Sequence, residues 1–457
     1  MAEQSLDVVR FTDPGLGNDA YVLVSGETAV AVDPARDVRR YLRAAEGQGA
    51  RIVAAVETHL HADFVSGVRE LAARGADVHA GEAAGLTFPH RPVREGTRVE
   101  VDGVSLVGLA TPGHSPEHLA YLVEGDPPIL FSGGALIPGG AARTDLLGEE
   151  RTVELARLLY RTLHERLAEL PDETIVHPTH GGGSFCSTGR GGSEDRSTTL
   201  GFERKNNPLF NADSEESFLE TLQSGYGLYP PYFLRLREIN RTGPRVLDGS
   251  TPPRLQPDDV DRELTAGSWA LDVREAKAYA TGHLRGSVVV PLRGGSFSVR
   301  MGWVVPWGTR LVLVAEDETA AGKAATKAAG VGYEDVAGWA TFESLRDAGM
   351  PVATTPIVDA EELARRMEPP DRPILLDVRH PPEWEEGTLP GAMTVEFGDL
   401  SREIPDELRR QPVITYCASG ARAAVAASLL ERAGIDSVTL FPGGPDEWRA
   451  SGRALDR

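Results

Sequence analysis

The chain has 457 residues, of which 41% are hydrophobic and 25% charged, with a net charge of −21. This length predicts about three domains, and the acidic balance argues against nucleic acid or anionic membrane as partners. No apolar run approaches the ~20 residues that span a bilayer, and the start, MAEQSLDVVRF, lacks the basic and apolar regions of a secretory signal, so we expect a cytoplasmic protein.

The first 200 residues alternate short apolar runs with helical patterns, which predicts an α/β or layered fold. An amphipathic helix is expected at 152–170, and a glycine ends the helical pattern at 38–50. Ligands on loops at strand ends are common in such folds. The expected strands, several of which run into a histidine-bearing loop, are 29–34, 52–59, 104–114, 127–136 and 172–180.

The texture changes near residue 245, where the Pro- and Gly-rich segment 242–257 predicts a linker. An internal repeat follows, because ALDVREAKAYATGHLRGSVVVPL (270–292) matches LLDVRHPPEWEEGTLPGAMTVEF (375–397). Each repeat alternates strands and helices and should form a small α/β domain with a parallel sheet. We therefore expect domains at 1–245, 246–353 and 354–457.

The segment VITYCASGARAAVAASLLERAG (413–434) places Cys417 between a β-rich run and an Ala-rich helix. A thiol at a helix N-terminus faces backbone N–H groups, and the nearby Arg422 adds a positive charge. Both effects favour the thiolate and make Cys417 a candidate nucleophile, with Gly420 shaping the loop. The alternative is a buried, inert cysteine, but packing gives no reason for Gly420 and Arg422.

The segment CASGAR (417–422) resembles the active loop of rhodaneses, and the DVR at 377–379 and GTLPGA at 387–392 resemble other motifs of that family. The resemblance implies that Cys417 accepts a sulfane sulfur as a persulfide and passes it on. The first repeat has Ala315 where the second has Cys417. It resembles a rhodanese domain without its nucleophile.

In the first domain, ETHLHADF (57–64) carries two histidines two residues apart on a loop after a strand, so both side chains can face one ion. Clustered polar groups of this kind are costly to bury without a partner. A shared metal site is favoured over separate hydrogen-bonded loop histidines. The candidate ligands are His59, His61, Asp63, His114 and His180.

The H-x-H-x-D pattern at 59–63 resembles the metallo-β-lactamase fold, an αββα sandwich. The segments ETHLHADFVSG, TPGHSPEHLAYL, HPTHGGGSFCS and GRGGSEDRSTTLGFERKNNP (189–208) resemble persulfide dioxygenases fused to rhodanese domains, and with the two repeats the resemblance covers nearly the whole chain. It implies one iron on two histidines, at His59 and His114, and on one aspartate.

Two positions depart from these families. Phe64 stands where two-metal members have a histidine, so a second metal is not expected. Gly134 in FSGGALIPGGAARTDL (131–146) stands where the resemblance implies the aspartate ligand. A neutral set of His59, His61 and His114 could still hold Zn²⁺, whereas iron would be held less tightly. We expect one Fe(II) or Zn(II) ion, weakly held or not iron, ahead of no metal and then two metals.

The favoured function is a rhodanese-type sulfurtransferase acting through Cys417 on thiosulfate or a low-molecular-weight persulfide, with a front domain that lacks one metal ligand. The alternatives are an active persulfide dioxygenase and sulfurtransferase producing sulfite and thiosulfate, a zinc thioester hydrolase, and a sulfur-carrier scaffold. Cys186, in HGGGSFC, is either a thiol that carries persulfide near the metal or a small apolar residue. We also expect a homo-oligomer.

Overall fold

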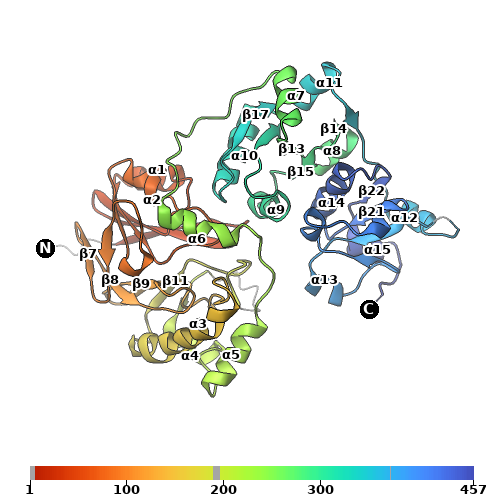
Figure 1. The fold of residues 1–457 in the computed structure, drawn as a ribbon. Helices are drawn as coiled ribbons and strands as arrows, with labels where there is room; N and C mark the ends of the chain where they lie inside the picture. Colours follow the sequence, from red (N-terminus) through yellow and green to blue (C-terminus); the bar gives the residue numbers. More distant parts are fainter. Residues whose placement is uncertain (1–5, 189–195, 371, 457) are drawn as a thin grey trace. The chain divides into compact units, whose positions relative to one another are not determined.

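The computed structural model describes residues 6–188, 196–370 and 372–456. It divides the chain into two compact units (Figure 1), one running to residue 248 with the short segment 329–332, the other holding 249–328 and the residues from 333 onward. In the described part of the chain, no helix is long and apolar enough to cross a membrane. The three-way domain division stays a prediction.

The first unit contains two six-stranded sheets, ordered β1-β2-β3-β4-β5-β6 and β12-β11-β10-β9-β8-β7. The first sheet consists of β1 (Asp7–Asp13), β2 (Asn18–Ser25), β3 (Thr28–Val32), β4 (Arg51–Glu57), β5 (Asp77–Gly81) and β6 (Arg91–Val93). The second consists of β7 (Arg98–Val101), β8 (Val104–Ala110), β9 (Leu119–Val123), β10 (Ile129–Gly133), β11 (Ile175–Pro178) and β12 (Thr198–Thr199). The expected strands are confirmed, with shifted ends.

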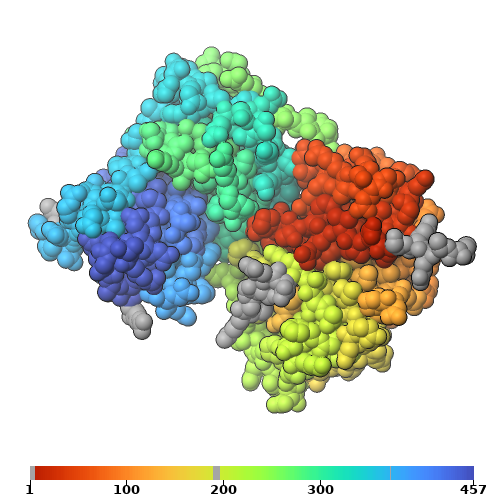
Figure 2. All heavy atoms as spheres, turned by 180° about the vertical axis from the view of Figure 1, so that it is seen from behind, coloured from red at the N-terminus to blue at the C-terminus, as the bar shows by residue number. Residues whose placement is uncertain are grey.

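Strand β2 shows why the two sheets stack. Successive side chains of a strand point to opposite faces. Tyr21 and Leu23 join the core between the sheets, and Val22 and Val24 join the core beneath the helices. Every residue of β2 is buried, so this strand is covered on both faces, and Figure 2 shows the two halves of the unit lying against each other.

Helices cover the outer face of each sheet, which completes the expected αββα sandwich (Figure 1). On the first sheet lie α1 (Arg39–Gly47) and α2 (Val68–Ala72), and on the second α3 (Glu149–Arg161), α4 (Leu200–Asn206) and α5 (Glu215–Ser224). The unit also holds the 3₁₀ turn η1 (Glu82–Ala84) and α6 (Phe233–Thr242).

The single helix expected at 152–170 is not continuous. Helix α3 ends at Arg161 and is followed by a wide π-helical turn, η2 (Thr162–Arg166), and a 3₁₀ turn, η3 (Leu167–Glu169). The hydroxyl of Thr162 donates to the carbonyl of Pro112, 2.7 Å away. This bond ties the π-helical turn to a loop about 50 residues away, a contact that sequence periodicity does not reveal.

The second unit contains two four-stranded parallel sheets, one in each repeat, as expected. The first is ordered β15-β13-β16-β17 and the second β20-β19-β21-β22. Their strands are β13 (Trp269–Asp272), β15 (Val288–Val289), β16 (Leu311–Val314), β17 (Val336–Ala340), β19 (Ile374–Asp377), β20 (Met393–Thr394), β21 (Val413–Tyr416) and β22 (Val438–Phe441). The pair β14 (His283–Leu284) and β18 (Val352–Ala353) is antiparallel.

Strands β16, β21 and β22 are buried along their whole length, as parallel strands between helices should be. The helices of the first repeat are α7 (Pro257–Thr265), α8 (Ala276–Thr281), α9 (Phe297–Val304), α10 (Glu318–Ala329) and α11 (Phe342–Asp347). Those of the second are α12 (Ala360–Arg366), α13 (Pro381–Glu385), η4 (Asp399–Ser401), η5 (Asp406–Arg409), α14 (Ala421–Arg432) and α15 (Gly444–Ala450).

The two repeats share an internal ion pair. Arg274 Nη2 lies 2.6 Å from Asp272 Oδ2, and Arg379 Nη2 lies 2.7 Å from Asp377 Oδ2. All four side chains are nearly inaccessible to solvent. The DVR motifs of the two repeats therefore have the same structural role. In each repeat the ion pair stabilises the end of the strand that carries the aspartate, β13 or β19.

Helix α14 of the second repeat also packs on the first repeat. Glu431 Oε2 lies 2.8 Å from His283 Nε2, and the Ser428 hydroxyl accepts a hydrogen bond from the backbone N–H of Val289 at 3.2 Å. Figure 2 shows the two repeats in contact. The helix that begins beside Cys417 thus contacts the first repeat along its second half.

Candidate functional site

Three loops of the first unit bring the predicted metal ligands together. The segment after β4 carries His59, His61 and Asp63, the loop between β8 and β9 carries His114, and the end of β11 leads to His180. All five side chains are buried. Residues separated by more than 100 positions in the sequence therefore meet at one end of the sandwich.

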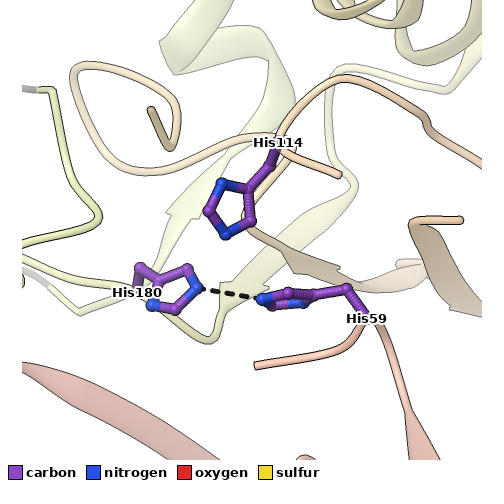
Figure 3. A group of neighbouring side chains, drawn as sticks. All are labelled: His59, His114 and His180. Atoms are coloured by element: carbon purple, nitrogen blue, oxygen red, sulfur yellow. Dashed lines mark hydrogen bonds between the residues drawn. The ribbon is translucent and has the colours of Figure 1, made fainter. Parts of the chain in front are cut away.

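His59, His114 and His180 form a group in which one ring nitrogen from each residue lies within 4.8 Å of the other two. His180 Nε2 and His59 Nε2 are 3.2 Å apart, and His114 stands over both rings (Figure 3). Inward-facing imidazole nitrogens at this spacing fit a single metal ion with a position left for water or substrate. The donor set thus suits Zn²⁺ or Fe²⁺.

Neighbouring groups set the orientation of these rings. His114 Nδ1 donates to the Arg143 carbonyl at 2.6 Å, which leaves Nε2 as a lone-pair donor. His59 Nδ1 lies 2.8 Å from the Thr58 hydroxyl. Burial lowers the pKa of both His59 and His114 well below 6.5, so the rings are neutral and able to ligate.

His61 faces two carboxylates. Its Nε2 lies 3.3 Å from Asp33 Oδ1 and 3.2 Å from Glu57 Oε2. Burial works to lower the pKa of His61, but Asp33 and Glu57 outweigh it and raise the pKa to about 10. The structure groups His180 with His59 and His114, a set that the sequence did not single out. His61 belongs to two further groups, one with Asp33 and His59 and one with Asp63 and His180.

Asp63 and Phe64 follow His61 on the same loop. Asp63 Oδ2 accepts from Asn18 Nδ2 at 2.6 Å and lies 3.3 Å from His180 Nδ1. Burial works to raise the pKa of Asp63, but the His180 interaction outweighs it and leaves the pKa lowered. Phe64 is buried and stacks on His61 with ring centroids 4.2 Å apart. The number of metal ions stays a prediction, because Asp63 also forms a candidate metal group with His61 and His180.

The thiol site lies in the second unit, where Cys417 directly follows β21. The backbone N–H of Gly420 donates to Cys417 Sγ at 3.1 Å. Gly420 has φ +84°, and a Cβ there would come within 2.8 Å of Pro442, so glycine is required. The loop thereby turns a backbone donor toward the sulfur just before α14 begins.

Arg422 adds a positive charge to the thiol site, where it interacts electrostatically with the Cys417 sulfur. Burial works to lower the pKa of Arg422, but Glu383 and Cys417 outweigh it and raise the pKa. Glu383 Oε1 accepts from Arg422 Nη2 at 2.8 Å. Glu383, on α13, was not predicted, because nothing in the sequence links it to a loop 34 or more residues away; the only available signal was its place in the repeated segment after DVR.

Comparison with known proteins identifies two families along the chain. Residues 13–180 match the metallo-β-lactamase superfamily, and residues 359–451 match the rhodanese-like domain. The chain fuses a metallo-β-lactamase domain to a rhodanese-like domain. The two sites described above lie in these two matched regions.

The curated relatives of the metallo-β-lactamase domain include hydrolases and a persulfide dioxygenase. A hydroxyacylglutathione hydrolase of Polaromonas sp. (strain JS666) is 35% identical over 169 residues, 36% of this chain and 62% of that relative. The mitochondrial persulfide dioxygenase ETHE1 of Mus musculus is 27% identical over 167 residues, 33% of this chain and 58% of that relative. The chain thus spans about three fifths of the length of these relatives.

Among solved structures, a metallo-β-lactamase from Staphylococcus aureus subsp. aureus COL is similar with a TM-score of 0.65 and 29% identity. The similarity covers 73% of this chain and 98% of that one. It therefore extends well beyond residues 13–180 and includes part of the region that holds the repeats.

Gly134 of the metallo-β-lactamase domain has a backbone conformation that other residues accept, but little room. A Cβ at this position would lie 2.7 Å from His114 Cδ2 and 2.9 Å from Ala142 Cβ. Its N–H donates to His118 Nε2 at 2.9 Å. The His114 ring therefore rests on the glycine, where the resemblance implied a carboxylate.

Cys186 lies in the metallo-β-lactamase domain next to Asp63 and is fully buried. Burial and the Asp63 carboxylate raise its pKa well above 9.0, although Arg143 acts in the opposite direction. The protonated thiol that results is a weak nucleophile. Arg143 was not predicted as a neighbour, because 43 residues separate it from Cys186.

The first repeat has no thiol at the position equivalent to Cys417. Ala315 follows β16 and its N–H donates to the Ala340 carbonyl at 3.0 Å. Within the segment GRGGSEDRSTTLGFERKNNP, residues 189–195 lie outside the described residues; from Arg196 onward the segment forms β12 and α4.

Proposed function

We propose that this protein is a sulfurtransferase in which Cys417 carries a sulfane sulfur as a persulfide. The observation that carries the proposal is the Gly420 N–H that donates to Cys417 Sγ at the start of α14, supported by the electrostatic interaction of Arg422 with the same sulfur. A backbone donor, a guanidinium and a helix N-terminus all favour negative charge on the sulfur. The match of residues 359–451 to the rhodanese-like domain supports the same chemistry.

The first half-reaction is an attack by the Cys417 thiolate on the outer sulfur of thiosulfate or of a persulfide. A new S–S bond forms to Cys417, the donor's S–S bond breaks, and its electron pair leaves with sulfite or with the donor thiolate. In the second half-reaction an acceptor thiolate attacks the same sulfur, and Cys417 leaves as a thiolate. The sulfane sulfur is transferred without net oxidation, so the step requires no cofactor.

The residues of the loop stabilise the charge that moves during both half-reactions. Gly420 donates to the Cys417 thiolate, and Arg422 balances the negative charge on the sulfur. The Arg422 guanidinium donates two hydrogen bonds to the Glu383 carboxylate, which hold Arg422 in place. Donors fixed in advance cost no rearrangement during the reaction.

The test is transfer of sulfur from thiosulfate to cyanide by wild type, Cys417→Ser and Cys186→Ser. We expect Cys417→Ser to fall to the background rate, because a hydroxyl cannot carry a sulfane sulfur. Cys186→Ser, the matched thiol control, should retain wild-type transfer. Substantial activity in Cys417→Ser, together with its loss in Cys186→Ser, would contradict the proposal.

A second candidate function belongs to the metallo-β-lactamase domain: oxidation of a persulfide by O₂ and water to sulfite, a thiol and two protons. Two observations favour it, the group of His59, His114 and His180 and the 27% identity to a mouse persulfide dioxygenase. These histidines would hold the metal, and a ferrous ion would supply the activation of O₂. The Thr58 hydroxyl would orient the ring of His59, and the Arg143 carbonyl would orient the ring of His114.

O₂ uptake with glutathione persulfide, measured after anaerobic loading with Fe(II) or Zn(II), tests this candidate. Uptake that requires Fe(II) and disappears in His114→Ala would support it. Hydrolysis of a glutathione thioester by the Zn(II) form, without O₂ uptake, would favour the hydrolase alternative suggested by the Polaromonas relative.

A further inference from the structure

Helix α9 of the first repeat packs against the segment that frames the thiol site. Trp303 is buried, and its ring lies 6.0 Å from that of His380 and 6.1 Å from that of Phe397. The hydroxyl of Ser401 donates to the Trp303 carbonyl at 3.3 Å. Since η4 contacts both α9 and α14, one short turn connects the helix of the first repeat to the helix that begins at the thiol loop.

Helix α9 also carries a cation, Arg300, whose charge acts on this site. The Nη1 atom of Arg300 is enclosed and has no hydrogen-bond partner among the described residues. The charged groups that act on its guanidinium are Cys417, Arg422 and Glu275. Burial lowers the pKa of Arg300 from its ordinary value, while the Cys417 charge acts to raise it. A half-buried guanidinium with an enclosed, free donor is a ready site for an anion.

The charge balance around Cys417 explains why a second cation matters. Arg422 is paired with Glu383, so part of its charge is already neutralised. Glu275 also acts on Arg300, and it forms a long contact with the exposed Arg293 at 3.7 Å. A thiosulfate dianion beside a Cys417 thiolate would bring together three negative charges, and these need more positive charge than Arg422 alone provides.

We propose that Arg300, contributed by the repeat that lacks a cysteine, binds the oxyanion end of a sulfur donor or product held at Cys417. The substrate class is an anionic sulfur oxyanion, thiosulfate as donor and sulfite as product, and this inference rests on the proposed sulfurtransferase function. The planar guanidinium matches two oxygens of a sulfonate group. The first repeat thereby supplies a substrate-binding residue to an active site whose nucleophile lies in the second.

Alkylation of Cys417 tests the charge at this site independently of sulfur transfer. Iodoacetate carries a negative charge and iodoacetamide does not, and both react with the thiolate, so the ratio of their rates reports the local potential. Both cysteines are buried, and peptide mass spectrometry reads the alkylation of Cys417 separately from that of Cys186. We expect the wild-type ratio to exceed that of 2-mercaptoethanol, and a ratio no higher would overturn the proposal without any variant.

The variants are Arg300→Gln and Arg300→Lys, with Arg293→Gln as the matched control, because the Arg293 side chain is 80% exposed in the same repeat. We expect Arg300→Gln to lower the ratio about tenfold and to raise KM for thiosulfate by a similar factor with less effect on kcat. Arg300→Lys should keep most of the ratio, and Arg293→Gln should leave it unchanged.

A ratio in folded Arg300→Gln equal to that of wild type would overturn the proposal. An equal fall in Arg300→Gln and Arg293→Gln would overturn it as well, since the effect would then be one of general charge. Wild type could prefer iodoacetate at Cys417, lose that preference in Arg300→Gln, and yet transfer no sulfur. This result would contradict the sulfurtransferase function and support the anion site at Arg300.

Discussion

At the residue scale, the sulfur of Cys417 has both a backbone donor and a guanidinium, and the two can be separated by mutation. Arg422→Ala removes the charge but leaves the Gly420 N–H in place. We expect kcat/KM for thiosulfate to fall roughly ten- to a hundredfold, less than for Cys417→Ser, because one of two stabilising groups remains. Steady-state kinetics beside Arg422→Lys measures this, and an unchanged rate in Arg422→Ala would remove Arg422 from the mechanism.

Gly134 offers a second test at this scale, since crowding and charge can be varied independently. The structure limits Gly134→Asp, because the new Cβ would lie 2.7 Å from His114 Cδ2. Gly134→Ala makes the same close contact without a carboxylate and is the matched control. We expect Gly134→Ala to lower metal content and Gly134→Asp to bind more Fe(II) than Gly134→Ala, because carboxylates stabilise ferrous iron.

Metal analysis after anaerobic loading with Fe(II) or Zn(II) reads out both variants. Equal iron in Gly134→Asp and Gly134→Ala would show that the new carboxylate does not reach the metal. Stoichiometric iron in wild type would show that His59, His114 and His180 hold it without a carboxylate at 134.

The candidate metal site shows which of its features could be predicted from the sequence. Spacing and strand ends identified all five candidate ligands, because loops that follow neighbouring strands emerge at the same end of a sheet. Which three histidines group together was not predictable. The selection depends on Asp33 and Glu57, which pair with His61 from positions that carry no motif. Arg300 escaped prediction for the same reason, since its role depends on packing between repeats.

At the element scale, α14 connects the thiol loop to the first repeat, and Glu431 is its principal polar contact. Glu431 accepts from the Gly286 N–H at 3.0 Å and lies 2.8 Å from His283 Nε2. We expect Glu431→Gln to lower the free energy of unfolding by roughly 1–3 kcal/mol, because a buried charged acceptor is lost. Asp436→Asn, which removes an exposed ion pair with Arg285, should cost less than about 1 kcal/mol.

The pH dependence of this contact has a defined sign. Burial works to raise the pKa of Glu431, but His283 and the Gly286 N–H outweigh it and leave the pKa below its ordinary value of 4.5. The contribution to stability is therefore complete above about pH 4.5 and is lost as the pH falls through the lower folded pKa. Urea unfolding of wild type and Glu431→Gln should differ most above pH 4.5, and a difference that grows on acidification would contradict this assignment.

Elements as a whole were the most predictable level. Apolar runs such as those of β4, β16 and β21 are long enough and well enough bounded to identify strands, and the repeat at an offset of about 100 residues indicated two similar sheets. The end of helix α3 was less predictable, because the π-helical turn that follows it contacts a loop far away in the sequence through Thr162 and Pro112.

At the scale of the whole molecule, the two chemistries reside in different units. Every described group of three side chains that could hold a metal lies in the first unit. Treatment with a metal chelator should therefore leave transfer of sulfur from thiosulfate to cyanide unchanged, while any metal-dependent activity of the first unit is lost. Loss of transfer after chelation, restored by added metal, would place a metal in the Cys417 reaction.

The most direct test of a Cys417 persulfide is to locate the transferred sulfur on the protein. Wild type is incubated with thiosulfate labelled at its outer sulfur, without an acceptor, then alkylated and digested. If Cys417 carries the sulfur, we expect one labelled sulfur on the Cys417 peptide and an equal amount of released sulfite. The label should be lost when cyanide is added. Label on the Cys186 peptide, or sulfite release without label on Cys417, would contradict it.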